Sequence, residues 1–151
     1  MASNLFHRIV VPTDFSGSSE EAWALARRVA GTLGSEVVLA HVYVEPILYG
    51  DPPLAADTAW QLYEHGRKWV EDELEKWASA ARAEGMTVRT IVRTGSPHEE
   101  IVNLATEERA ELIIMGTHGR TGLDRLLLGS VADRVIRFSP CPVLTVRKPE
   151  E

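Results

Sequence analysis

The chain has 151 residues, a formal net charge of −6 and a single cysteine. This length suits one domain with a buried core, and we predict a single domain over residues 1–151. The negative charge argues against a nucleic-acid partner, because such proteins need a basic surface to neutralise phosphates. One cysteine leaves no basis for a disulfide within the chain. The apolar runs are too short to span a bilayer, and the first residues lack a secretory signal, so we expect a cytoplasmic protein.

The chain opens with a strand, a turn and a helix. Residues 9–11 are β-branched and apolar, which predicts a short strand that ends in the turn Pro12-Thr13-Asp14. Ser18 is followed three residues later by Glu21, the spacing of a capping box at a helix start. Apolar residues at helical spacing then continue to Leu33, so we predict a helix from Ser18 to Leu33.

A second strand, a loop and a long helix come next. Residues 37–42 predict a strand, and 43–53 a loop rich in proline, glycine and aromatic residues. An amphipathic helix is predicted over about 58–84, followed by a strand over 88–92. The tryptophans of this helix are expected to serve packing or a dimer contact rather than a cofactor: Trp60, Trp69 and Trp77.

The second half of the chain repeats the alternation of strands and helices. Ser96-Pro97 marks a helix start, and 112–115 is the most apolar strand of the chain. A loop rich in glycine, arginine and leucine runs over 116–129, a helix starts at Ser130, and a last strand covers 143–146. This order predicts an α/β fold with a parallel sheet that helices cover on both faces.

In such a sheet, ligands bind beyond the carboxyl ends of strands where the strand order reverses. Two segments have the right place, Pro12-Thr13-Asp14 after the first strand and the loop that starts at Gly116. They meet if the first and fourth strands are neighbours. Gly116 and Gly119 would let the backbone approach a ligand, and Gly129-Ser130 lies at a helix start, where free N–H groups favour phosphate.

Simpler interpretations exist for the same residues. Ser130 with Asp133 is also a capping box, and Asp14 before Phe15 can be a turn former. Arg120 can neutralise a phosphate or be an ordinary loop charge. The combined spacing across both segments favours a nucleotide site, in which the Asp14 carboxylate would accept from ribose hydroxyls or help to hold magnesium.

The stretch Gly116-x-x-Gly119, nine residues, Gly129-Ser130 resembles the nucleotide-binding signature of the universal stress protein family. The segments 9–14, 40–42 and 139–144 also resemble that family's first strand and turn, its second strand end and the entry to its last strand. The resemblance implies an open five-stranded parallel sheet in the order 3-2-1-4-5. It also implies a homodimer that pairs through the last strand, Val143 to Val146.

The resemblance further implies a role for each matching residue in holding ATP. Asp14 would contact ribose, and Val42 would contact adenine through its backbone. Gly116 and Gly119 would line the ribose and phosphates, with Arg120 nearby. Backbone N–H groups and the serine hydroxyl would hold the phosphates. The full expected set is Pro12, Thr13, Asp14, Val42, Met115, Gly116, Gly119, Arg120, Gly129, Ser130 and Val131.

Two features depart from the family pattern. Phe15 follows Asp14 where many members carry a small residue, so the turn is expected to differ. The segment 46–56 does not align, and we interpret it as a lid over the adenine.

These observations predict an ATP-binding regulator or sensor of a stress response, with Mg²⁺ accompanying the nucleotide and no dedicated catalytic group. The chain has neither a Gly-x-x-x-x-Gly-Lys loop nor a Gly-x-Gly-x-x-Gly after its first strand, which argues against a kinase-type ATPase and a dinucleotide dehydrogenase. Two alternatives stay open. One is a slow magnesium-dependent nucleotide hydrolase or transferase that uses Asp14 and His118, and the other is an interaction module without nucleotide.

Overall fold

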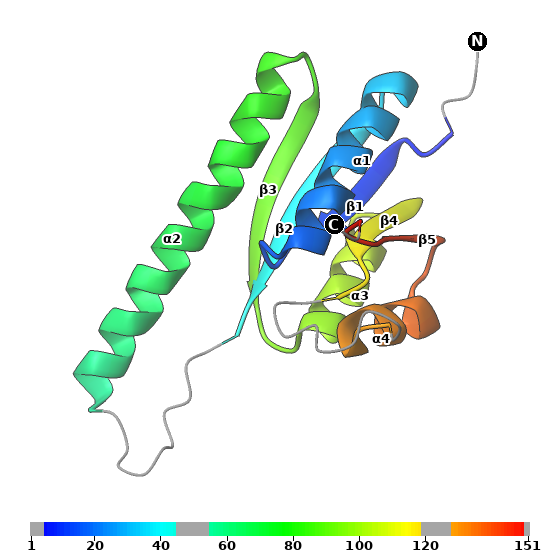
Figure 1. The fold of residues 1–151 in the computed structure, drawn as a ribbon. Helices are drawn as coiled ribbons and strands as arrows, with labels where there is room; N and C mark the ends of the chain where they lie inside the picture. Colours follow the sequence, from blue (N-terminus) through cyan, green and yellow to red (C-terminus); the bar gives the residue numbers. More distant parts are fainter. Residues whose placement is uncertain (1–4, 45–54, 119–127, 150–151) are drawn as a thin grey trace.

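The computed structural model describes residues 5–44, 55–118 and 128–149. In these residues five parallel strands form one sheet in the order β3-β2-β1-β4-β5 (Figure 1). This confirms the predicted α/β fold and strand order. The elements are β1 Arg8–Pro12, α1 Gly17–Leu33, β2 Glu36–Tyr43, α2 Ala56–Ala83, β3 Thr87–Thr94, α3 Pro97–Glu107, β4 Leu112–Gly116, α4 Ser130–Phe138 and β5 Val143–Val146.

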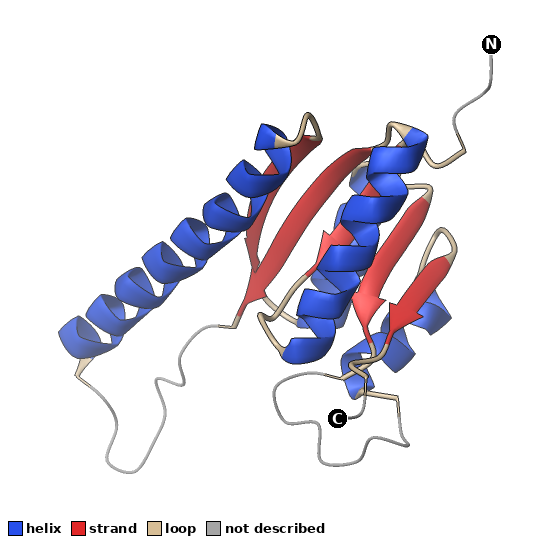
Figure 2. Cartoon of the chain, turned by 45° about the horizontal axis from the view of Figure 1, so that its top comes forward, coloured by secondary structure: helices blue, strands red, loops and turns tan. Residues whose placement is uncertain are grey.

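Helices cover both faces of the sheet (Figure 2). The side chains of Ile9 and Val11 enter a core formed with α1 and α2, whereas Val10 and Ile113 enter a second core formed with α3 and α4. Strands buried on both faces need apolar residues at every position, which explains the continuous apolar runs of β1 and β4. Each fully buried side chain of this size contributes about 1.5–3 kcal/mol through the hydrophobic effect.

The start of α1 differs from the prediction. The N-cap is Ser16, whose side chain accepts a hydrogen bond from the N–H of Ser19, and the helix begins at Gly17. The predicted capping role of Ser18 was therefore wrong. Ser18 is buried, and its hydroxyl donates to the carbonyl of His118 at 2.5 Å. A local sequence pattern cannot reveal this helix start, because hydrogen bonds to a distant segment decide where the helix begins.

Helix α2 is 28 residues long, and its amino-terminal half extends beyond the sheet (Figure 1). Its second half packs on the sheet through Val70, Leu74, Ala78 and Ala81, all of which are buried. In the sequence of α2, charged residues stand between the apolar residues of this face. Within the described residues, no helix is both long and apolar enough to cross a membrane.

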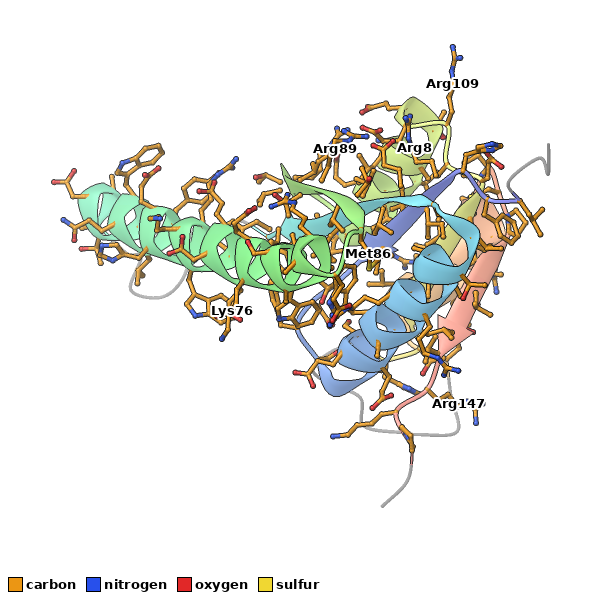
Figure 3. All side chains as sticks on the ribbon, turned by 90° about the horizontal axis from the view of Figure 1, so that it is seen from above. Arg8, Lys76, Met86, Arg89, Arg109 and Arg147 are labelled. Atoms are coloured by element: carbon orange, nitrogen blue, oxygen red, sulfur yellow. The ribbon has the colours of Figure 1, made fainter. Side chains whose placement is uncertain are left out.

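A network of charged side chains joins three strands and α3 at the amino edge of the sheet. Glu36 on β2 pairs with Arg8 at 3.1 Å and with Arg89 at 2.7 Å, and Arg89 also reaches Glu108 at 2.5 Å. Arg8 and Arg89 lie on the same side of the molecule in Figure 3. The hydrogen bond from Arg89, more than any other contact, holds the pKa of Glu36 below its usual value. This network braces the scaffold at the edge opposite the carboxyl ends of the strands.

Candidate functional site

A cleft of about 720 Å³ opens at the carboxyl edge of the sheet. The ends of β1, β2 and β4, the beginning of α4 and parts of α2 and α3 line it. Nine of the residues expected from the sequence lie on its wall: Pro12, Thr13, Asp14, Val42, Met115, Gly116, Gly129, Ser130 and Val131. The other two, Gly119 and Arg120, lie outside the described residues, and so does most of the segment 46–56. The structure therefore brings together segments that are about 30 to 100 residues apart in the sequence.

The cleft exists because the chain leaves neighbouring strands in opposite directions. β1 lies between β2 and β4, and it is followed by α1 on one face of the sheet. β4 leads instead to α4 on the other face. The two connections diverge and leave a crevice between them, which is the usual ligand position in open parallel sheets.

The turn between β1 and α1 is fixed by its own hydrogen bonds. Asp14 Oδ1 accepts from the N–H of Ser16 at 3.0 Å and from the hydroxyl of Ser19 at 2.7 Å. Phe15 has a left-handed backbone with φ of 63°, which is uncommon for a residue other than glycine. Its N–H donates to Thr13 Oγ1 at 3.0 Å. Asp14 thus forms the turn, as the simpler interpretation held, while it also lines the cleft.

The two glycines Gly116 and Gly129 are required by contacts within the protein. A Cβ on Gly116 would lie 2.8 Å from the carbonyl carbon of Ser18 and 2.9 Å from the nitrogen of Ser19. A Cβ on Gly129 would lie 2.7 Å from the carbonyl oxygen of Thr117. The sequence-based reason for Gly116, close approach to a ligand, is therefore incomplete, because the backbone of α1 already occupies that space.

His118 lies where the glycine-rich loop begins. Its carbonyl accepts from the hydroxyls of Ser18 at 2.5 Å and Ser16 at 3.3 Å, which ties β4 to the start of α1. Its ring Nδ1 lies 2.8 Å from the hydroxyl of Thr117. Nε2 is buried and has no hydrogen-bond partner in the part of the chain that the structure describes. The ring is thus oriented by a neighbouring hydroxyl.

Helix α4 presents its amino end to the cleft. Its N-cap is Gly129, and no side-chain cap hydrogen bond forms there in the described residues. Ser130 is the first residue of the helix, so the interpretation of Ser130 as the cap residue was wrong. The first N–H groups of a helix lack partners within the helix, and its dipole favours negative charge at this end. The arrangement can hold an anionic group next to Ser130.

The strand β2 contributes backbone groups to the same cleft. The carbonyl of Ala40 accepts from the N–H of Thr13 at 2.8 Å, and the pairing of β1 with β2 ends at Ala40. Backbone polar groups alternate sides along a strand, so those of Val42 point the same way as those of Ala40. They face the space beyond the end of β1, which is part of the cleft.

Three aromatic residues of the cleft were missed by the sequence reasoning: His41, Tyr43 and Trp69. His41 donates from Nδ1 to the carbonyl of Thr13 at 2.7 Å and so ties β2 to the turn before Asp14. His41 and Tyr43 could have been inferred from their place at the carboxyl end of β2. Trp69 could not, because its position depends on how far α2 reaches past the sheet.

Among the described residues, no group of three or more histidine, cysteine, aspartate and glutamate side chains is arranged to hold a metal ion. The polar groups of the cleft include the Asp14 carboxylate, several hydroxyls, backbone amides and the rings of His41 and His118, which suit a ligand with hydroxyl and anionic groups.

Comparisons with known proteins agree with this architecture. A model of the universal stress protein family matches residues 5–147. Universal stress protein MJ0531 from Methanocaldococcus jannaschii is 41% identical over 150 residues, which cover 98% of this chain and 86% of the relative. The solved structure of hypothetical protein MJ0577, from the same organism, has a TM-score of 0.84 and 33% identity, and the match covers 97% of this chain and 99% of that one. A universal stress protein solved in complex with cAMP has a TM-score of 0.71 and 26% identity, with 96% and 98% covered.

Proposed function

The chain belongs to the universal stress protein family, and we propose that it holds an adenine nucleotide, ATP in particular, in the cleft at the carboxyl edge of its sheet. The observation that carries this proposal is that Asp14 after β1, Val42 at the end of β2 and Ser130 at the start of α4 all lie on the wall of one cleft. These three positions are the ones to which the family resemblance assigns contacts with ribose, adenine and phosphate. One ligand with a base, a sugar and an anionic tail fits this order.

The phosphate end is supported by the start of α4. Gly129 caps the helix without a side-chain hydrogen bond, so the first-turn N–H groups near Ser130 and Val131 suit anionic oxygens. The hydroxyl of Ser130 adds a further donor. Because backbone dipoles rather than lysines supply the positive potential, a protein with a net charge of −6 can still bind a polyphosphate.

The base end is supported by an apolar space on the α3/α4 side of the sheet. Met115, Ile101 and Val131 line it, and the backbone of Val42 supplies hydrogen-bonding groups at its edge. A flat purine fits an apolar slot with polar groups on one edge only. The relative solved with cAMP supports an adenine nucleotide as the class of ligand.

Magnesium would accompany the nucleotide in this proposal. Its ligands would come mainly from phosphate oxygens, which is the usual way proteins bind Mg²⁺ with nucleotides. The carboxylate of Asp14 is engaged by the N–H of Ser16 and the hydroxyl of Ser19. That engagement favours a holding role over a general base, so ATP would act as a signal rather than as a rapidly consumed substrate.

Titration calorimetry with ATP and Mg²⁺ tests the binding site. Ser130→Ala removes one hydroxyl donor and leaves the helix intact, so ATP affinity is expected to fall about 3- to 10-fold, the usual worth of one hydrogen bond. Ser79→Ala, which changes a serine on the exposed side of α2, is the matched control and should bind like the unaltered protein. No binding heat and no thermal shift with millimolar ATP in the unaltered protein would overturn the proposal.

The regulatory part of the proposal is a homodimer that pairs through β5 and responds to the nucleotide. β5 pairs with β4 on one side and forms an edge of the sheet, and Leu144 at its centre is 40% exposed. An apolar edge strand needs a partner or cover. The amide of Thr117, at the start of the glycine-rich loop, donates to the carbonyl of Val146 at the end of β5, so the edge is joined to the site.

Such a sensor suits the cytoplasm, where ATP is made and used.

Sedimentation velocity tests the dimer. Leu144→Glu is expected to convert a dimer into a monomer at micromolar concentration, because the charge would be desolvated in the strand pairing. Leu62→Glu changes a leucine that is 50% exposed on α2, and it should leave the dimer unchanged. A monomeric unaltered protein, with and without ATP, would contradict the dimer.

A further inference from the structure

The cleft extends over both faces of the sheet. Along β2, the side chains of Ala40 and Val42 belong to the α3/α4 core, whereas Leu39 and Tyr43 belong to the α1/α2 core. Both Val42 and Tyr43 line the cleft. One part of the cleft therefore lies under α2, on the opposite face of the sheet from the apolar space proposed for the base.

This part, which we term the aromatic compartment, is formed by Tyr43, Gly66, Trp69 and Val70. Val70 is buried and forms its floor, whereas Trp69 is 50% exposed. Gly66 allows the Tyr43 ring to lie against the backbone of α2, because a Cβ there would be 3.0 Å from Tyr43 Cζ and closer still to the hydroxyl. None of these four residues is charged.

Aromatic residues outside the aromatic compartment pack against the rings of Trp69 and Tyr43. Trp69 meets Phe15 edge to face at a centroid distance of 5.2 Å, and Phe15 stacks on His41 at 5.2 Å and contacts Trp77 at 5.4 Å. Tyr43 meets Tyr63 edge to face at 5.3 Å. Side chains fixed before binding lose little conformational entropy when a ligand arrives, so such a surface favours binding.

The left-handed backbone conformation of Phe15 positions its ring for these aromatic contacts. A residue other than glycine with φ of 63° is conformationally costly, and it persists where the surrounding packing compensates. Here the conformation places the Phe15 ring between His41, Trp69 and Trp77. Phe15, the residue that departs from the family pattern, thus supports Trp69 of the aromatic compartment.

We infer that the aromatic compartment is a second subsite, which binds a planar, uncharged aromatic ring separately from the nucleotide. A half-exposed tryptophan and a tyrosine on the wall of one cleft offer π surface for stacking, and the buried Val70 disfavours a charged or strongly hydrated group. The compartment is part of the same cleft as the proposed nucleotide site, and Asp14 and Ser19 also line that cleft.

The indole N–H signals of the four tryptophans give a direct test in a ¹⁵N-labelled protein without nucleotide. Titration with 2-naphthol, a neutral planar probe, is expected to shift the Trp69 signal along a saturable curve. Trp60 is the internal control, because it lies on the same helix with 63% exposure but is not part of the cleft wall. Trp69→Phe and Trp60→Phe assign the signals. Equal shifts at Trp60 and Trp69, or no shift at Trp69, would overturn the inference.

A variant pair gives the affinity change. Trp69→Leu is expected to weaken naphthol binding about tenfold, in line with the loss of one stacking partner, and Trp60→Leu should not. Thermal melting confirms that both variants are folded. Saturating ATP should leave the naphthol affinity unchanged, and its loss would show that the two ligands share one site. Because the first titration contains no nucleotide, its result does not depend on whether ATP binds.

Discussion

Replacing Asp14 with alanine is expected to weaken ATP binding by about 10- to 100-fold, because a hydrogen bond to a charged group is worth about 1.5–3 kcal/mol. The carboxylate lines the cleft, and it also accepts from the N–H of Ser16 and the hydroxyl of Ser19. Alanine therefore removes the proposed ligand contact and loosens the turn that carries it. Titration calorimetry with ATP and Mg²⁺ measures the loss.

Asp14→Asn separates the two effects. The asparagine side chain keeps an oxygen for Ser16 and Ser19 and removes only the charge, so the expected loss is smaller, about 5- to 10-fold. Asp57→Asn, on the exposed first turn of α2, is the control for a lost charge elsewhere and should have no effect. ATP affinity that is unchanged in a folded Asp14→Ala protein would remove this carboxylate from the binding site.

Gly116→Ala is expected to lower the free energy of unfolding by about 1–3 kcal/mol, the usual cost of inserting a methyl group into a close-packed interior. The added Cβ would lie 2.8 Å from the carbonyl carbon of Ser18 and 2.9 Å from the nitrogen of Ser19. Both are backbone atoms near the start of α1, so they cannot move aside as a flexible side chain could. Urea denaturation followed by circular dichroism measures the change.

Gly31→Ala is the matched control for that experiment. Gly31 lies in α1, and beyond the adjacent turns of its own helix backbone an added Cβ would meet no described atom within 4 Å. Alanine is a better helix former than glycine, so this variant is expected to gain about 0.5–1 kcal/mol. Equal stability of the Gly116→Ala protein and the unaltered protein would show that α1 can move away from β4 without cost.

The contacts of Gly116 and Gly129 also change how the glycine signature is understood. Both glycines are needed for packing, Gly116 against α1 and Gly129 against the carbonyl of Thr117. A bulky substitution at either position is expected to damage the fold whether or not a nucleotide binds. Loss of ATP binding in such a variant would therefore not identify a ligand contact. Substitutions at Asp14 and Ser130 test ligand contacts more directly.

The order of polar and apolar residues by itself determined the class of fold. Alternating apolar strands and amphipathic helices leave few arrangements other than a parallel sheet covered on both faces, because each apolar surface has to be buried. The place of the cleft followed as well, since parallel strands all end at one edge and Asp14 and Gly116 directly follow two of them. The order of the strands came from the family resemblance rather than from periodicity.

Only the tertiary structure decided which residues form the wall of the cleft. Hydrogen bonds from Ser16 and Ser18 to His118, about 100 residues away, set the start of α1 and moved the cap from its predicted place. The contacts of Phe15 with His41 and Trp69 join the first turn to β2 and α2, at positions more than 25 residues further along the sequence. Local patterns report which residues are buried and how the backbone is shaped nearby. The aromatic compartment depends instead on how far α2 lies past the sheet edge, which long-range packing alone determines.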